Sequence, residues 1–221
     1  IPKKIGIPKK TPVKYIVGQD CKREKIWRNN LFSQYNGTRG DYSDAKVQPG
    51  PFFKIVYQEQ LFQNIKDLTL DVIRNSNLEA DDCLAITSKY LIQQNPENKI
   101  YIITSDTDYL QLIQPNISLY NLKYKPVNTE KNSLGCPKKD LLYKIIIGDK
   151  SDNIPSVFPK CGPKKTLNYV NNVDLFEEHL IKYNALEQFK LNRRLIDFTQ
   201  IPDLLKNDVI KQLDNILKRY N

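Results

Sequence analysis

The 221-residue chain has no methionine, one histidine, one tryptophan and four cysteines. The cysteines lie far apart and form no Cys-x-x-Cys pair, so the sequence predicts neither a zinc site nor a disulfide framework. No apolar run approaches the roughly 18 residues of a membrane span, and no secretory signal is visible. These absences favour a globular chain in a reducing, intracellular setting. Because residue 1 is isoleucine, we expect a processed, trimmed or incomplete form.

Positive charge is in excess along the chain, but it is unevenly distributed. The net charge is +9, from 34 Lys and Arg against 25 Asp and Glu. Residues 1–46 carry +7 and residues 112–170 carry +6, whereas residues 47–111 carry −4 and residues 171–221 are neutral. A basic protein often binds a polyanion such as nucleic acid. The pattern is typical either of uneven surface charge or of an acidic, metal-holding centre flanked by phosphate-binding segments.

Apolar runs and helical spacing alternate along the first 136 residues. Short β-rich runs predict strands at residues 14–20, 69–73, 99–105 and 117–122. Helical spacing predicts helices at 22–35, 55–68 and 79–94, a short helix capped by Ser105 and Asp106, and a loop at 36–51. We therefore expect an α/β domain in residues 1–136, with a mainly parallel central sheet flanked by helices, and a helical C-terminal lobe in residues 137–221.

Eight acidic residues follow predicted strands or lie in a turn. Asp20 ends the first strand; Glu79, Asp81 and Asp82 follow the second; Asp106 and Asp108 follow the third; Asp149 and Asp152 lie in the turn GDKSDN. Ligands of open parallel sheets bind beyond the carboxyl ends of the strands, so these acids are expected to meet at one edge. Divalent cations would neutralise their mutual repulsion, and Mg²⁺ is the usual choice beside phosphates. The alternative is that they are solvated surface acids.

Paired metal ions indicate a class of reaction. Two ions about 3.5–4 Å apart stabilise both the attacking and the leaving oxygen of a phosphodiester displacement. This chemistry needs no histidine, cysteine or serine nucleophile, and the sequence offers no convincing one. The surrounding basic segments would then hold a polyanionic substrate over the ions.

Four segments, in this order, resemble motifs of the 5′-nuclease superfamily, which includes flap endonucleases, the 5′-nuclease domains of bacterial polymerases, and phage 5′-exonucleases with phage RNase H. They are EADD at 79–82, ITSDTDYLQLI at 103–113, GDKSDNIPSV at 148–157 followed by CGPKKT, and NRRLIDFTQIP at 192–202. The resemblance covers roughly residues 14–200. It implies a PIN-like 5′-nuclease fold whose C-terminal lobe contains a helix–turn–helix that binds DNA.

The resemblance also implies a role for each matching residue. Asp20, Glu79 and Asp81 would hold a first metal ion, with Asp82 close by, and Asp106, Asp108, Asp149 and Asp152 would hold a second, some of them through water. Mn²⁺ is expected to substitute for Mg²⁺.

The same resemblance implies contacts to nucleic acid. The helix–turn–helix at 154–170 would bind the duplex backbone through main-chain amides, Gly162 and three lysines (Lys160, Lys164 and Lys165), with a potassium ion, K⁺, in its turn. The alternative for these lysines is an ordinary solvated turn. Arg28 and Arg39 would contact phosphate in an arch that starts near Trp27, whereas Trp27 and Tyr35 themselves are expected to pack in the core.

Two departures from the family pattern bear on activity. Members usually carry a metal-binding aspartate at the end of an earlier strand, whereas only a Lys- and Pro-rich lead-in precedes residue 14 here. The arch motif Tyr-Lys-x-x-Arg reads YNGTR, so Asn36 stands in place of the usual lysine. Lys22, Arg23 or Lys25 would then supply the positive charge beside the nucleic acid.

These features together predict a monomeric, Mg²⁺-dependent, structure-specific 5′-nuclease of DNA replication or repair. Its substrate would be DNA with a 5′ flap, a nick or a free 5′ end, or an RNA–DNA hybrid. The expected location is the cytoplasm or the nucleoid, inside the host cell if the chain is viral. The alternative is a non-catalytic protein that binds branched nucleic acid on the same scaffold, and a third reading is a structural α/β protein with acidic loops. Keeping all eight acids favours the nuclease.

Overall fold

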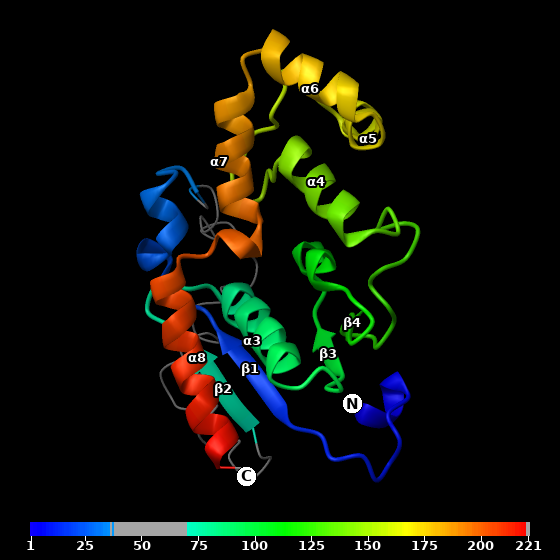
Figure 1. Cartoon of the computed structure of the whole chain (residues 1–221), viewed down its shortest axis with the longest axis vertical. Coiled ribbons are helices and arrows are strands. Elements are labelled where there is room, and N and C mark those ends of the chain that lie inside the picture. Colours follow the sequence, from blue (N-terminus) through cyan, green and yellow to red (C-terminus); the bar gives the residue numbers. More distant parts are fainter. Residues whose placement is uncertain (36, 38–69, 220–221) are drawn as a thin grey trace, which may run out of the picture.

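The computed structural model describes residues 1–35, 37 and 70–219 (Figure 1). Its strands are β1 (Tyr15–Gln19), β2 (Leu70–Arg74), β3 (Ile100–Ile103) and β4 (Ile117–Tyr120). Its α-helices are α3 (Ala80–Gln94), α4 (Pro137–Ile147), α5 (Pro163–Asn171), α6 (Val173–Lys182), α7 (Leu186–Ile196) and α8 (Asp203–Lys218). Short 3₁₀ helices are η1 (Pro2–Ile5), η2 (Arg23–Lys25), η3 (Trp27–Asn30), η5 (Thr107–Leu112) and η6 (Phe198–Gln200).

Several predictions fall on residues that the structure does not describe. The loop predicted at 36–51, apart from Gly37, and the helix predicted at 55–68 lie outside the described residues. Asn36 and Arg39 lie outside them as well. Their expected roles in the arch therefore stay predictions.

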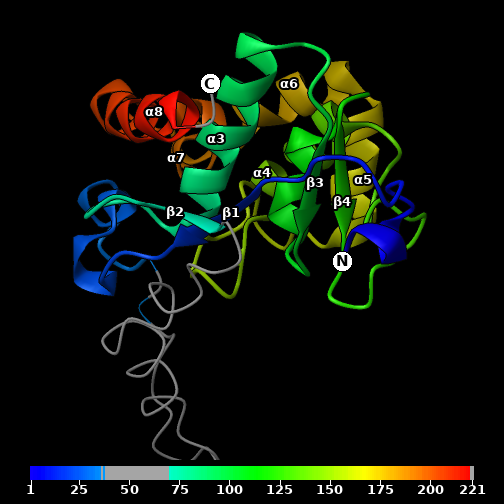
Figure 2. The same cartoon turned by 90° about the horizontal axis from the view of Figure 1, so that it is seen from below.

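The four described strands form two parallel pairs. β1 pairs with β2, with Tyr15 opposite Leu70, and β3 pairs with β4, with Ile100 opposite Ile117. The predicted parallel α/β architecture is confirmed, but within the described ranges the strands form two hydrogen-bonded pairs and not one continuous sheet. Figure 2 shows the pairs from below, with α3 and α8 on one side of the β1–β2 pair.

Helix α3 packs against both strand pairs and so sets the position of the acidic residues at its start. Its Cys83 is completely buried in the core beside β2, and its Leu84 packs against the core of β3 and β4. Gly18 of β1 allows the close approach of this helix, because a Cβ there would lie 2.5 Å from the carbonyl oxygen of Ala80. The end of β1 is therefore held directly against the first turn of α3.

The segment after β1 differs from its prediction as a helix. Residues 22–35 form two short 3₁₀ helices, η2 and η3, connected by turns. The Trp27 amide donates a hydrogen bond to the Asn77 carbonyl over 3.0 Å, which ties this segment to the chain just before α3. Trp27 and Tyr35 are buried, as expected. Tertiary contacts thus override the helical spacing of the apolar residues here.

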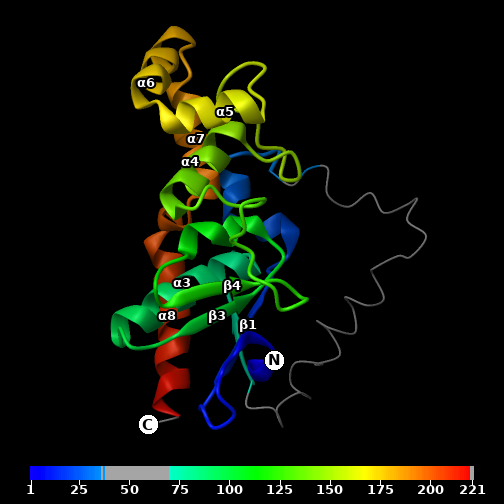
Figure 3. The ribbon, with the colours of Figure 1, turned by 90° about the vertical axis from the view of Figure 1, so that its right-hand side faces the viewer.

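Helices α4 to α7 form the opposite end of the molecule from the strand pairs (Figure 3). Phe158 lies at the centre of their core, in ring contact with Tyr169 and Phe176. Helix α8 instead runs back beside α3 and β2 (Figure 1), where Val209 and Leu213 are completely buried. Helix α8 therefore contributes to the α/β core although it lies at the end of the chain. Among the described helices, none combines the length and apolar character that crossing a membrane requires.

Candidate metal centre

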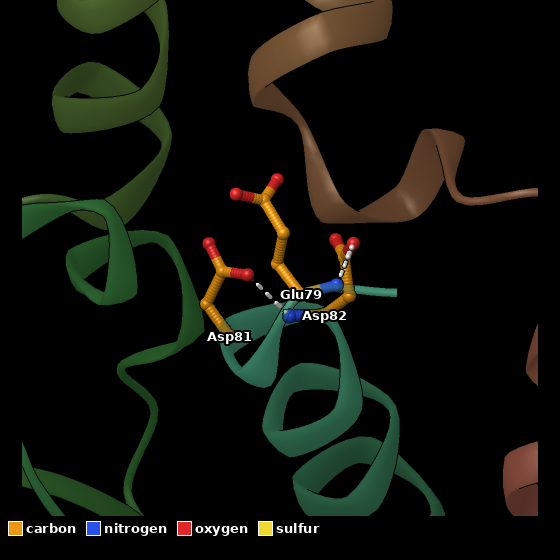
Figure 4. A group of neighbouring side chains, drawn as sticks. All are labelled: Glu79, Asp81 and Asp82. Carbon is orange, nitrogen blue, oxygen red and sulfur yellow. Dashed lines mark hydrogen bonds between the residues drawn. The ribbon is translucent and has the colours of Figure 1, made fainter. Parts of the chain in front are cut away.

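The first acidic group lies at the start of α3, beyond the carboxyl end of β2. Glu79, Asp81 and Asp82 offer carboxylate oxygens that lie within 4.8 Å of one another (Figure 4). Glu79 is the N-cap residue of α3, and the Asp82 carboxylate accepts a hydrogen bond from the Glu79 amide over 3.3 Å. The Asp81 carboxylate accepts one from the Asp82 amide over 2.7 Å. Negative charge is favoured at a helix N-terminus, because the unpaired amides and the helix dipole both stabilise it.

Asp82 differs from its neighbours because its oxygens are already occupied. Arg28 donates to both carboxylate oxygens over 2.7 Å, and the Trp27 indole donates over 3.0 Å. Asp82 is completely buried, and Arg28 is only 2% exposed. Both Asp82 oxygens are thus engaged by Arg28, and the expected place of Asp82 close to a metal ion stays a prediction. Arg28 itself lies in the interior, bonded to Asp82 and Glu79, and its expected contact with phosphate stays a prediction.

Glu79 and Asp81 are the members of this group whose charge is least compensated. Arg28 and the Tyr35 hydroxyl donate to Glu79 over 3.1 and 2.9 Å, yet burial still raises the pKa of Glu79 to about 7. Burial, together with the Asp82 charge, raises the pKa of Asp81 well above its ordinary value. A cation beside these carboxylates would favour their charged forms. Asp20 follows β1 and is not one of the three, but its carboxylate accepts a hydrogen bond from the Ala80 amide in the first turn of α3 over 2.8 Å.

The second acidic group combines η5 with the turn after α4. Asp108, Asp149 and Asp152 offer oxygens within 4.8 Å of one another. Asp106 lies beside them as the N-cap of η5, as predicted, and accepts a hydrogen bond from the Asp108 amide over 2.9 Å. The turn is closed by reciprocal amide–carbonyl bonds between Asp149 and Ile154, of 2.9 and 2.7 Å. This closure holds Asp149 and Asp152 on one short loop.

Sequence reasoning missed Lys144, which lies within the second group. Its ammonium is 2.7 Å from Asp108 and donates to Asp149 over 2.6 Å. Burial alone would lower the pKa of Lys144, but the two carboxylates raise it above its ordinary value. Burial likewise opposes ionisation of Asp149, but hydrogen bonds from Lys144 and Ser151 bring its pKa below the ordinary value. Lys144 lies in the predicted helix KKDLLYKIIIG. Its spacing of five residues from Asp149 is the feature of the sequence that could have identified it as a partner of the second acidic group.

Two amide side chains that the sequence did not single out hold this site together. Asn192 of α7 is completely buried and donates to the carbonyls of Ile145 and Pro155 over 2.9 and 2.7 Å. Gln111 of η5 donates to the carbonyls of Asp108 and Ile196 over 2.9 and 3.1 Å. Helix α7 is thereby joined to both segments that carry the second acidic group.

The predicted DNA-binding residues are exposed. Gly162 caps α5, and Lys164 and Lys165 lie in its first turn after Pro163, while Lys160 precedes it with a φ of 50°. Lys22, Arg23 and Lys25 are also exposed, at η2. A cleft of about 360 Å³ lies between η5, α4 and α5, and Asp108, Lys131, Lys144 and Lys164 are among its lining residues. Three lysines, Lys131, Lys144 and Lys164, thus line a cleft that also contains Asp108 of the second acidic group.

Both acidic groups have the donor set of a site for hard divalent cations. Their ligands are carboxylate oxygens, and each group gathers three of them from one or two short segments. In the first group Asp82 is committed to Arg28, which leaves Glu79 and Asp81, with Asp20 beside them. In the second group the three carboxylates lie close to one another, and Lys144 contacts two of them, Asp108 and Asp149. The residues present therefore fit two sites for oxygen-bound divalent cations.

Comparison with known proteins places this arrangement in a family. The family profile described as "5'-3' exonuclease, N-terminal resolvase-like domain" matches residues 6–137. The 5′-3′ exonuclease of Buchnera aphidicola subsp. Acyrthosiphon pisum (strain APS) is 31% identical over 182 residues, covering 80% of this chain and 58% of that protein. The ribonuclease H of Enterobacteria phage T4 is 25% identical over 215 residues, covering 89% of this chain and 68% of that protein.

A solved structure agrees with the fold. The structure of T5 5′-exonuclease with bound divalent zinc ions matches with a TM-score of 0.69 at 19% identity, over 98% of this chain and 86% of that one. The chain spans somewhat more than half the length of the Buchnera relative. The profile match over more than half of the residues, together with the shared fold, shows that this chain belongs to the 5′-3′ exonuclease family.

Proposed function

We propose that this chain is a divalent-metal-dependent 5′-nuclease that hydrolyses phosphodiester bonds near junctions of single- and double-stranded DNA, or in RNA–DNA hybrids. The observation that carries the proposal is the gathering of carboxylates from the start of α3, from η5 and from the turn after α4 into two groups, in a chain of this family. A flap, a nick and a free 5′ end are the candidate substrates.

The metal ions would be two Mg²⁺, for which Mn²⁺ can substitute. Glu79, Asp81 and Asp20 would hold the first, and Asp108, Asp149 and Asp152 the second, with Asp106 in support through water. When bound, such ions supply charge neutralisation at the attacking and leaving oxygens of a phosphodiester. The chain's own polar residues do the positioning: Arg28 holds Asp82 and touches Glu79 from one side.

The exposed basic residues would bind the nucleic acid. Lys164 and Lys165, with the amides of the first turn of α5, can contact phosphates, because a helix N-terminus favours anions. Lys160 and Gly162 would complete this element, with K⁺ in the turn. Lys22, Arg23, Lys25 and Arg39 would supply further positive charge to the nucleic acid. We further propose that residues 1–136 form the nuclease domain and residues 137–221 the DNA-binding lobe, whose last helix, α8, packs back onto the α/β core, in a monomer that acts in the cytoplasm or nucleoid.

Cleavage of a labelled 5′-flap oligonucleotide tests the function. The protein should cleave the flap in Mg²⁺ and not in EDTA. Asp81→Asn and Asp149→Asn should each lower the rate at least about a hundredfold, or about 2.7 kcal/mol in activation free energy. Asp174→Asn, an exposed acid of α6 outside both groups, is the matched control and should keep the full rate.

The same assay separates the nuclease from a non-catalytic binder. A binder would hold the flap DNA with strong salt dependence and give no product at any Mg²⁺ or Mn²⁺ concentration. Equal cleavage by the wild type and by Asp81→Asn would also overturn the proposal, because the acidic groups would then have no part in the reaction.

A further inference from the structure

Lys144 occupies the centre of the second acidic group. Its ammonium donates a charge-assisted hydrogen bond to Asp149 over 2.6 Å and forms an ion pair with an Asp108 oxygen 2.7 Å away, and that buried oxygen has no hydrogen-bond partner among the described residues. The Lys144 side chain is 25% exposed, and the two carboxylates are less exposed than that. The lysine is therefore the counterion of this pair in the absence of a metal ion.

A divalent cation and the Lys144 ammonium compete for the same oxygens. Magnesium holds oxygen ligands at about 2.0–2.1 Å. An ion that binds Asp108 and Asp149 together must lie between their oxygens, where the ammonium now lies. Two positive charges at one position repel strongly, so the ion can bind only when the ammonium leaves.

The surroundings of Lys144 give its ammonium a place to go. The side chain lines the cleft between η5, α4 and α5, which it shares with Lys131 and Lys164. Its backbone is fixed in α4, but lysine has a flexible stem and carries its charge at the tip. The tip can therefore swing from the carboxylates into the cleft without any change in the helix.

We propose that Lys144 is an exchangeable counterion: it neutralises Asp108 and Asp149 until a divalent cation replaces it, and then moves into the cleft to contact a phosphate of the substrate. This inference rests on the proposed nuclease function. It couples metal binding to nucleic-acid binding, because each ion that enters the second group releases one positive charge toward the DNA.

Manganese titration of the DNA-free protein tests the exchange. At pH 8, binding is measured by calorimetry and by the electron paramagnetic resonance signal of free Mn²⁺. Lys144→Met removes the competing charge and should tighten Mn²⁺ binding at the second group about tenfold or more, because the ion no longer displaces an ammonium from its hydrogen bond to Asp149 and its ion pair with Asp108. Lys144→Arg keeps the charge and should bind no more tightly than the wild type. Lys144→Gln replaces the methionine variant if that variant does not fold.

Two further variants assign the effect to this site. Lys139→Met makes the same charge change on an exposed lysine of the same helix, which hydrogen-bonds Asn171, and should leave Mn²⁺ affinity unchanged. Adding Asp149→Asn to Lys144→Met should abolish the gain. Equal Mn²⁺ affinity of the wild type and Lys144→Met would overturn the proposal, and the role of Lys144 would then be to stabilise the fold.

The salt dependence of DNA binding tests the second half of the proposal. Both the reference protein and the Lys144→Met protein carry Asp81→Asn, so that the flap DNA is not consumed. A lysine that contacts one phosphate contributes about 0.9 to the slope of log affinity against log salt. Lys144→Met should lower this slope by about 0.9 in Mn²⁺ and leave it unchanged in EDTA. The same slope difference in both conditions would overturn the release step.

These results are independent of cleavage. If the wild type binds Mn²⁺ and Lys144→Met binds it more tightly, but neither cuts DNA, the counterion proposal survives and the nuclease proposal fails. If the wild type cuts DNA but the titrations of the two proteins coincide, the reverse holds.

Discussion

Replacing Arg28 by methionine is expected to destabilise the protein strongly, because it leaves a buried carboxylate without its counterion. Arg28 is 2% exposed and donates to both oxygens of Asp82, and Asp82 is completely buried. The Arg28 Nε–H also donates to the Leu195 carbonyl over 2.6 Å, which joins the segment after β1 to α7. Methionine fills much of the same space but can replace none of these donors.

The size of the loss follows from the burial of the pair. Removing one partner of a buried ion pair costs about 3–5 kcal/mol, because the remaining charge stays out of water. Proteins commonly have a free energy of unfolding of about 5–15 kcal/mol, so the loss is a large share of the total. In urea it corresponds to a fall of about 1–2 M in the unfolding midpoint.

Urea denaturation of the metal-free protein, followed by circular dichroism, measures this loss. Arg193→Met is the control, because Arg193 is 54% exposed and its pair with Asp197, at 3.4 Å, should contribute less than about 1 kcal/mol. Adding Asp82→Asn to Arg28→Met should recover part of the loss, since it removes the unpaired charge and keeps an acceptor for the Trp27 indole. A loss below about 1 kcal/mol in Arg28→Met, or no recovery in the double variant, would refute the reasoning.

Three other outcomes are expected from the same structure. Gly148→Ala should lower the free energy of unfolding by about 1–3 kcal/mol, because φ at this residue is +77° and a Cβ would lie 2.5 Å from the Pro155 carbonyl oxygen. Gly135→Ala is the control: the backbone has the same φ, but a Cβ would meet nothing within 4 Å, so the urea midpoint should fall less. Asn192→Leu removes both buried donors and should cost about 1–3 kcal/mol; an unchanged urea midpoint would contradict its bridging role. Burial raises the folded-state pKa of Glu79 from 4.5 to about 7. Protonated Glu79 therefore contributes its full stabilisation to the metal-free folded protein below about pH 4.5, and this contribution is lost as the pH rises through about 7. Urea midpoints in EDTA between pH 5 and 8 should fall, and Glu79→Gln should flatten that fall.

The parts of the fold that depend on local pattern could be predicted from the sequence. Continuous apolar runs gave β1 and β3, and helical spacing after EADD gave α3. The cap at Asp106 followed from its side-chain chemistry, which competes for a backbone amide. The gathering of acids at strand ends was also predictable, because parallel strands share one carboxyl edge.

The parts that depend on distant partners could not be predicted in this way. Arg28 and Asp82 are 54 residues apart, and whether that arginine faces a phosphate or a buried carboxylate depends on the packing between them. The predicted helix at 22–35 failed for the same reason, because its backbone bonds go to the chain before α3. Lys144 reads as one more polar position of α4 until the turn after the helix brings Asp149 back to it.

Trp27 is the only tryptophan of the chain, and it lies against the first acidic group. Its ring is buried, the Arg28 guanidinium lies 4.7 Å from the ring centroid, and its indole N–H is bonded to Asp82. The protein thus carries a single tryptophan, whose emission can be excited selectively and reports the electric field beside the first acidic group. Ion loading there, and the opening of that corner during unfolding, can be followed optically without any label.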